Sequence, residues 1–145
     1  MKRPQLDEWR ARALEYLPEF RSLIEEQTGP TDLWIELSHQ LVKEYDRQPI
    51  DEERIGRVYD YAAWCAVEPD TGDPERDPSR AVAVGFLEDL PLNRRVADDL
   101  HRWISAEAFA GCEALFRCAL SEQEYQRFAA NFRRKRKQFS GPARL

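Results

Sequence analysis

The two histidines of this chain each follow a carboxylate by three residues, at Glu36-x-x-His39 and Asp98-x-x-His101. This spacing puts an acid and an imidazole on one face of a helix, where both can bind one metal ion. Di-iron and di-manganese helical bundles use two Glu-x-x-His motifs together with two further glutamates. Aspartate at position 98 departs from that pattern, and Glu36 lies at the edge of an apolar stripe. A di-metal bundle built on Glu36, His39, Asp98 and His101 is therefore one alternative hypothesis.

Four carboxylates bracket the turn at Pro91 and point to a different chemistry, the recognition of a basic protein. Glu88 and Asp89 precede the turn, and Asp98 and Asp99 follow it. Adjacent residues on a helix point to different sides, so neither pair is arranged for general acid–base catalysis. The four residues form either an acidic rim that binds a basic partner surface or a solvated face without a specific role.

The consecutive residues Tyr59, Asp60 and Tyr61 extend this candidate surface. They lie in a predicted helix, where three successive positions cannot all face one core. Tyrosine is enriched at protein interfaces, so a side chain of this trio that faces outward is a candidate contact. We therefore add Asp60 and Tyr61 to the candidate partner-binding residues.

A run of five cations, Arg133, Arg134, Lys135, Arg136 and Lys137, ends an apolar helical pattern. It is either a solvated helix end, favoured by the helix dipole, or a docking arm for nucleic acid or an acidic partner. Residues 121–145 carry a net charge of +5, whereas the first 120 residues carry −10. The acidic body argues against nucleic-acid binding except through this tail.

Signatures of catalysis are missing from the sequence. It has no G-x-S-x-G nucleophile turn, no phosphate-binding glycine loop, no H-E-x-x-H motif and no dinucleotide fingerprint. The three cysteines form no C-x-x-C pair and lie in apolar helical patterns, so we expect buried, reduced thiols. The sequence predicts no cofactor and favours a non-enzymatic protein.

The N-terminal sequence and the composition predict where in the cell the protein resides. Five of the first ten residues are charged and they contain no apolar stretch, and no run of about 18 apolar residues occurs in the chain. We therefore expect neither a secretory signal nor a membrane span. With 34% charged residues in 145, the chain has the composition of helices with wide solvated faces. We therefore expect a cytoplasmic protein without a membrane partner.

Apolar residues recur at spacings of three and four through most of the chain, which predicts an all-α domain. The acidic, proline-containing loop 68–77 divides it into two helical halves within a single domain, 1–132, and residues 133–145 form a basic helix end and tail. The arrangement is either a compact irregular bundle or a stack of HEAT-like helical hairpins. We predict eight helices, at about residues 6–17, 18–27, 32–45, 51–66, 79–90, 93–104, 105–116 and 121–132.

Capping residues and a second apolar stripe refine this prediction. Thr31 or Asp32 is expected to cap the third helix, and Asp51 the fourth. Ser121-x-x-Glu124 has the form of a capping box. In the third helix, Ile35 and Val42 form a stripe beside the main one, so we expect that helix to pack on two sides. Ser105 is expected to cap the seventh helix.

The segment 78–91, PSRAVAVGFLEDLP, is the most apolar of the predicted helices and has a glycine, Gly85, at its centre. A buried helix without a side chain at its centre is expected to press against another backbone. We therefore predict that this helix forms the centre of the core.

The stretches LWIELSHQLVKEYD, RVYDYAAWCAV and AVAVGFLEDLP resemble a family of small uncharacterised bacterial all-helical proteins. That family is loosely associated with the immunity proteins of toxin–immunity systems, and the resemblance covers about residues 14–128. It implies a non-enzymatic protein that binds another protein, such as a nuclease toxin whose substrate phosphates an acidic rim would imitate. The second hypothesis for the function is a helical adaptor or self-associating homo-oligomer, and the third is the di-metal bundle.

Overall fold

Every regular element of the computed structural model is a helix, and the structure describes residues 8–145. The first seven residues of the predicted domain 1–132 lie outside that range. The predicted all-α bundle is confirmed. The α-helices are α1 (Glu8–Tyr16), α2 (Arg21–Glu26), α3 (Pro30–Glu44), α4 (Glu52–Ala66), α5 (Pro78–Gly85), α6 (Arg94–Asp99), α7 (Ala106–Gly111), α8 (Glu113–Ala119) and α9 (Glu122–Gln138), and the 3-10 helices are η1 (Pro18–Phe20), η2 (Leu87–Leu92) and η3 (Leu100–Arg102).

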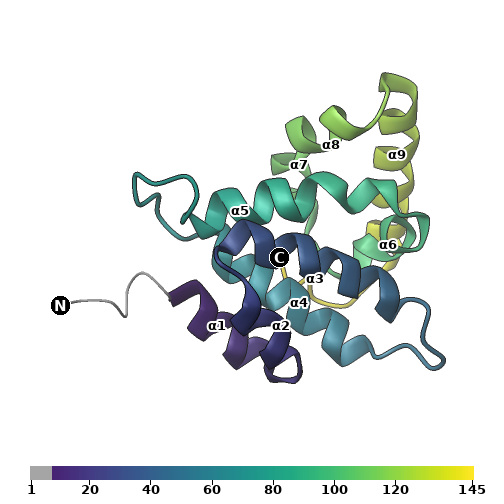
Figure 1. Cartoon of the computed structure of the whole chain (residues 1–145). Helices are drawn as coiled ribbons and strands as arrows, with labels where there is room; N and C mark the ends of the chain where they lie inside the picture. Colours follow the sequence, from purple (N-terminus) through teal and green to yellow (C-terminus); the bar gives the residue numbers. More distant parts are fainter. Residues whose placement is uncertain (1–7) are drawn as a thin grey trace.

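Helix α5 lies at the centre of the molecule, as its apolar sequence predicts. It packs against α3 and α4 of the N-terminal half, and η2, which follows it, packs against α8 of the C-terminal half. Figure 1 shows α5 running across the middle, with α1 to α4 on one side and α7 to α9 on the other. The loop 68–77 that precedes α5 projects from the side of the molecule.

Gly85 makes the close backbone approach that the sequence predicts. A Cβ atom at this position would lie 2.8 Å from the Cβ atom of Trp34 and 3.3 Å from the carbonyl oxygen of Thr31. The absence of a side chain therefore lets α5 and α3 pack closer than any other residue would allow.

The predicted helix 79–90 is wrong in its second half, because α5 ends at Gly85. Phe86 has a non-helical backbone conformation (φ −134°, ψ −65°), and the chain continues as η2 with Pro91 inside it. Proline has no N–H group to extend an α-helical ladder. The end of α5 is held by Ser38 of α3, whose hydroxyl donates a hydrogen bond of 2.7 Å to the carbonyl of Gly85. A terminal helix carbonyl is thereby satisfied from another element.

Two more predicted helices are divided in the structure. Residues 93–104 form α6 and then η3, in which the N–H of Trp103 bonds the carbonyl of Leu100. Residues 105–116 form α7 and then α8, with the break at Gly111 and Cys112. Glycine disfavours the helix interior, which accounts for a break at this position.

Three of the predicted helix caps are confirmed and one is wrong. Asp51 accepts from the backbone of Arg54, Ser105 from that of Ala108, and Ser121 forms the capping box with Glu124. The cap of α3 is neither Thr31 nor Asp32. Its N-cap is Gly29, because Pro30 occupies the first helical turn, where its missing N–H is not needed.

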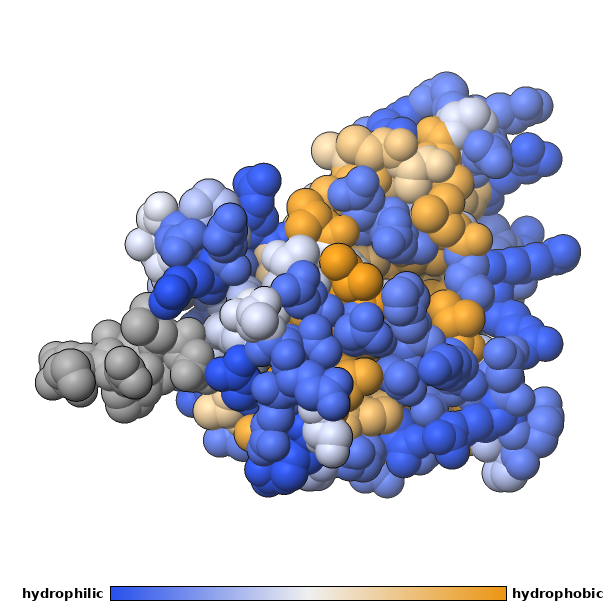
Figure 2. All heavy atoms as spheres, viewed as in Figure 1, coloured by the Kyte–Doolittle hydropathy of each residue, from blue (hydrophilic) through white to orange (hydrophobic). Residues whose placement is uncertain are grey.

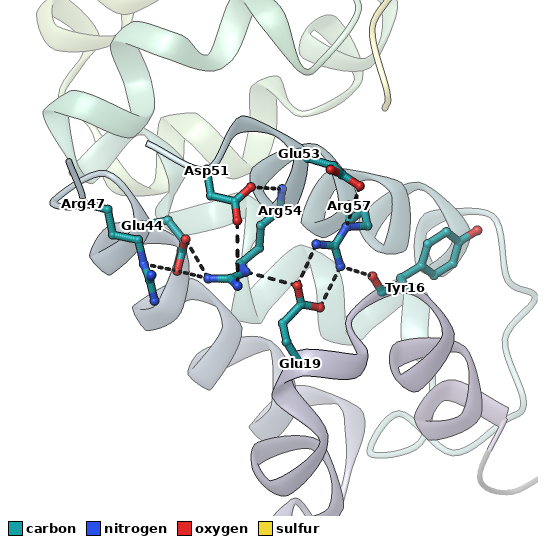
Figure 3. Close-up of polar contacts among 8 residues, drawn as sticks. All are labelled: Tyr16, Glu19, Glu44, Arg47, Asp51, Glu53, Arg54 and Arg57. Carbon is teal, nitrogen blue, oxygen red and sulfur yellow. Dashed lines mark hydrogen bonds and ion pairs between the residues drawn. The ribbon is translucent and has the colours of Figure 1, made fainter. Parts of the chain in front are cut away.

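An ion-pair network joins η1, α3 and α4, as Figure 3 shows. Glu44, at the end of α3, is 1% exposed and accepts from Arg54 at 3.2 Å and from Arg47 at 3.1 Å. Arg54 also reaches Glu19 of η1, which accepts two hydrogen bonds from Arg57 at 2.7 and 2.6 Å. The network ties three elements together, and its carboxylates are occupied by internal partners.

We expect Glu19 to make stability depend on pH in the acid range. The hydrogen bonds from Arg57 lower the pKa of Glu19 to about 2, from an ordinary value of 4.5. A lowered carboxyl pKa stabilises the fold above about pH 4.5, and this contribution is lost as the pH falls toward 2. Glu19→Gln is expected to lower the free energy of unfolding by about 1–2 kcal/mol at pH 7.

Urea unfolding at pH 7 and near pH 2 measures this effect. The difference between the wild type and Glu19→Gln should shrink at the lower pH. Glu25→Gln, which removes an exposed pair with Arg21, is the control and should stay within about 0.5 kcal/mol of the wild type. An equal Glu19→Gln deficit at both pH values would contradict the assignment.

Within residues 8–145, none of the helices combines the length and the apolar character that crossing a membrane requires.

Candidate functional site

The second apolar stripe of α3 is exposed, which corrects the prediction that this helix packs on two sides. The side chains of Ile35 and Val42 are 43% and 36% exposed, whereas the main stripe residues Leu37 and Leu41 are buried. Leu92 of η2 is 60% exposed. Large aliphatic side chains on α3 and η2 are thus only partly covered by the rest of the fold.

These three side chains border one groove of about 290 Å³ between α3 and the η2–α6 segment, which we call the α3–η2 groove. Figure 2 shows hydrophobic surface on the face formed by α3 and α5, which continues over the C-terminal helices and is interrupted by hydrophilic side chains. The floor of the groove consists of buried core residues, so it is firm as well as apolar. The lining is Ile35, Ser38, His39, Leu41, Val42, Gly85, Phe86, Asp89, Leu90, Leu92, Asn93 and Val96.

The break after Gly85 shapes this groove. The chain leaves the α-helical path at Phe86 and winds into η2, which places Leu90 in the floor and Asp89 and Leu92 at the surface. The opposite side is the stripe of α3, where Ile35, His39 and Val42 recur at spacings of four and three. The groove therefore depends on the contact between α3 and α5 that Gly85 permits.

Most polar groups of the groove are already engaged. Ser38 donates to the carbonyl of Gly85, and the side chain of Asn93 accepts from the backbone N–H of Val96 as the cap of α6. His39 is exposed and lies 3.9 Å from Glu36. Asp89 is exposed and forms no ion pair with another described residue. The groove thus presents apolar walls, the exposed imidazole of His39 and one carboxylate without an ion-pair partner.

The four carboxylates predicted to form an acidic rim do not share one environment. Asp99 is half-buried and accepts from the Tyr45 hydroxyl at 2.5 Å and the Trp103 indole at 2.9 Å. Asp98 lies 3.8 Å from Lys135 and 3.9 Å from Arg94. Glu88 and Asp89 lie on η2, and neither forms an ion pair with another described residue.

The Asp60–Tyr61 pair is engaged within the fold, and the prediction for Tyr61 is wrong. Tyr61 is fully buried, and its hydroxyl donates a hydrogen bond of 2.8 Å to the carbonyl of Trp9. Asp60 accepts from Arg144 at 2.7 Å. A surface partner cannot reach Tyr61 without unfolding the core.

The predicted di-metal site is also wrong. Among residues 8–145, no group of three or more histidine, cysteine, aspartate or glutamate side chains is arranged to hold a metal ion. His39 is exposed, whereas the ring of His101 packs edge-on against Phe139 at 5.7 Å. Helical spacing places each acid near its histidine along the chain, but the packing of α3 and α6 does not bring the two pairs together.

We expect His101 to make stability depend on pH below about 6.5. Burial lowers the pKa of His101 below its ordinary value of 6.5. The nearby charges of Lys135 and Arg102 also lower this pKa, whereas the charge of Asp99 raises it. Because the unfolded chain then binds more protons, stability should rise with pH up to about 6.5 and fall as the pH drops below it. Replacing the histidine by glutamine should flatten this slope in urea unfolding, and an unchanged slope would contradict the assignment.

The basic run is divided between the fold and the surface. Lys135 donates to the carbonyl of Asp98 at 3.0 Å, and Arg136 donates to that of His101 at 2.8 Å. These two cations therefore anchor α9 to the segment of α6 and η3. Arg133, Arg134 and Lys137 are exposed and remain candidates for a contact with nucleic acid or an acidic surface.

The cysteines show no sign of activation for catalysis. Cys65 and Cys112 are buried as predicted, and burial raises the pKa of the Cys65 thiol to about 12 and that of Cys112 above its ordinary value. A nucleophilic cysteine requires the opposite shift. Cys118 is exposed, which corrects the prediction that it is buried.

The α3–η2 groove is the site that sequence reasoning misses. The sequence assigns Ile35 and Val42 to packing and does not single out Leu92. The signal for the groove is an apolar stripe on the otherwise polar side of α3. Comparison with protein-family models, curated proteins and solved structures finds no match to this chain.

Proposed function

We propose that this chain is a non-enzymatic protein that binds a segment of another protein in the α3–η2 groove. The observation that carries the proposal is the exposure of Ile35, Val42 and Leu92 around an apolar floor. Contiguous exposed apolar surface on a folded domain commonly marks an interaction site. Three of the six exposed large aliphatic side chains of the described residues border this one groove.

The chemistry of the groove favours binding over catalysis. Its only hydroxyl, that of Ser38, donates to a backbone carbonyl and is not paired with a base. Its only carboxylate is that of Asp89. A nucleophile beside an oriented base is the arrangement that covalent catalysis requires, and the lining does not provide it.

Charge favours a different protein over a second copy of this one. The chain has a net charge of −5, and Glu88 and Asp89 of η2 have no cation within ion-pair distance among residues 8–145. A two-fold dimer formed through the groove would press these carboxylates against a second surface of a chain with the same net negative charge. A partner with a basic surface would instead pair them.

The biological role that we favour is an immunity-type inhibitor of a bacterial toxin, which would meet its partner in the cytoplasm. The three cysteines are free, which fits a reducing compartment. The following experiment separates this role from a self-associating protein by whether the chain captures another protein, and from a helical adaptor by whether the captured protein is a toxin.

To test the proposal, the wild-type chain and the Val42→Asp/Leu92→Asp variant are each used to capture binding proteins from the source cell. Leu92 is mostly exposed and Val42 about one-third exposed, so we expect the variant to stay folded, which urea unfolding checks. A captured protein is identified, purified alone and titrated against the wild-type chain. We expect a one-to-one complex that the double variant weakens by about 100-fold or more, because the variant places charges in an apolar contact.

Val67→Asp is the matched control, since Val67 is 79% exposed and does not line the groove. This variant should bind like the wild type. The proposal is overturned if the partner binds the double variant equally well, if the chain captures only itself, or if no purified partner binds.

A further inference from the structure

The shape of the α3–η2 groove limits the conformation of a bound segment. The exposed stripe from Ile35 to Val42 spans two helical turns, a length of about 10 Å. Leu92 stands on the opposite side. A helix laid along α3 would present apolar residues at i, i+4 and i+7 to such a groove, which is the pattern of helix-in-groove recognition.

Backbone hydrogen bonding favours the same conformation. The described residues contain no strand, so the groove offers no sheet edge to which an extended peptide could add. The hydroxyl proton of Ser38 and the Oδ1 atom of Asn93 already make internal hydrogen bonds, so the Nδ2 group of Asn93 and the exposed imidazole of His39 are the polar groups left in the lining beside Asp89. An extended segment on this apolar floor would leave its N–H and C=O groups without partners, whereas a helix satisfies its own.

The charge of Asp89 limits the sequence of the bound segment. Asp89 lines the groove beside the buried residues Phe86 and Leu90 and has no ion-pair partner in residues 8–145. A docked segment would take water away from this carboxylate, and an unpaired carboxylate without water is costly. In contrast, Asp98, Asp99 and Asp60 have cations of the chain itself nearby.

We infer that the groove takes an amphipathic α-helix of a partner protein that carries a lysine or arginine facing Asp89. This inference rests on the proposed function, and it adds the conformation and the charge of the bound segment. Asp89 is then the residue that determines specificity, while the aliphatic side chains supply most of the affinity.

The test uses designed peptides of about 18 residues, long enough to form a helix in water. One peptide carries leucines at i, i+4 and i+7 with flanking lysines. A second has glutamates in place of the lysines, and a third has a central proline in the lysine peptide. Fluorescence anisotropy measures binding to wild type, Asp89→Lys and the control Val67→Asp.

We expect the lysine peptide to bind both wild type and Val67→Asp at least about 10-fold more tightly than the glutamate peptide binds them. The preference should reverse in Asp89→Lys, and the proline peptide should bind at least about 10-fold more weakly. Equal binding of the two charged peptides, equal binding of the proline peptide, or no binding of any peptide would overturn the inference.

The two proposals fail separately. If Val42→Asp/Leu92→Asp abolishes binding of a purified natural partner while the peptides show no charge or helix preference, the groove binds proteins but not by this recognition. If the natural partner ignores the groove, the proposed function itself fails.

Discussion

Gly85→Ala is expected to lower the free energy of unfolding by about 2–3 kcal/mol. The added methyl group would lie 2.8 Å from the Cβ atom of Trp34 and 3.3 Å from the carbonyl oxygen of Thr31. Both atoms are fixed by the backbone of α3, so neither can move aside as the end of a flexible side chain would. The two helices must separate, and forced separation in a packed core costs about this much. Urea unfolding monitored by tryptophan fluorescence measures the change.

Gly111→Ala is the matched control for this substitution. Gly111 ends α7 and is exposed, and a methyl group added there would have no neighbouring atom within 4 Å. Replacing a helical glycine by alanine at an open position should be neutral or stabilise the protein by up to about 1 kcal/mol. If the two variants unfold at the same urea concentration, the close contact between α3 and α5 is not as described.

Arg54→Met is expected to destabilise the protein by about 3 kcal/mol, the second large effect. Glu44 is 1% exposed, and Arg54 donates to both of its carboxylate oxygens at 3.2 Å. Methionine keeps much of the apolar stem but removes the charge, which leaves the buried carboxylate with Arg47 alone. Removing one partner of a buried ion pair commonly costs about 3–5 kcal/mol, and the remaining arginine should reduce that cost.

A double-mutant cycle separates the interaction from the loss of packing. The cycle compares Glu44→Met, Arg54→Met and Glu44→Met/Arg54→Met with the wild type. The double variant removes both charges and should recover much of the stability lost in Arg54→Met. Arg21→Met, which breaks the exposed pair with Glu25, is the control and should change stability by less than about 0.5 kcal/mol. A double variant that is no more stable than Arg54→Met would show that the charges are not coupled.

The features that the sequence predicts well depend on local chemistry. The all-α class, the caps Asp51, Ser105 and Ser121, and the loop 68–77 follow from periodicity and from residues that act within one turn. The close approach at Gly85 is also predictable from a glycine within an apolar segment, although the structure places that glycine at the end of α5.

The features that it misses depend on contacts between distant elements. The end of α5 is fixed by Ser38, which lies 47 residues away along the chain. Periodicity shows that Ile35 and Val42 share a stripe, but it does not show whether another element covers that stripe. Tyr61 packs on Trp34, and its hydroxyl can be buried because it bonds the carbonyl of Trp9, a partner 52 residues away.

These differences change the candidate site more than the fold. The predicted acidic rim is divided: Asp98 and Asp99 are engaged within the fold, while Glu88 and Asp89 have no ion-pair partner among residues 8–145. The exposed aliphatic residues beside them, which the sequence assigns to packing, provide the apolar part of a docking surface. The site therefore combines one predicted acidic pair with a groove that only the packing reveals.

Photo-crosslinking in the source cell tests the central claim, that the α3–η2 groove binds another protein, most directly. Benzoylphenylalanine is placed at position 92, on the groove, or at position 67, an exposed valine outside it. We predict an adduct with one other protein from position 92, which Val42→Asp abolishes, and none from position 67. Equal adducts from both positions, an adduct only with a second copy of this chain, or no adduct from position 92 would contradict the claim.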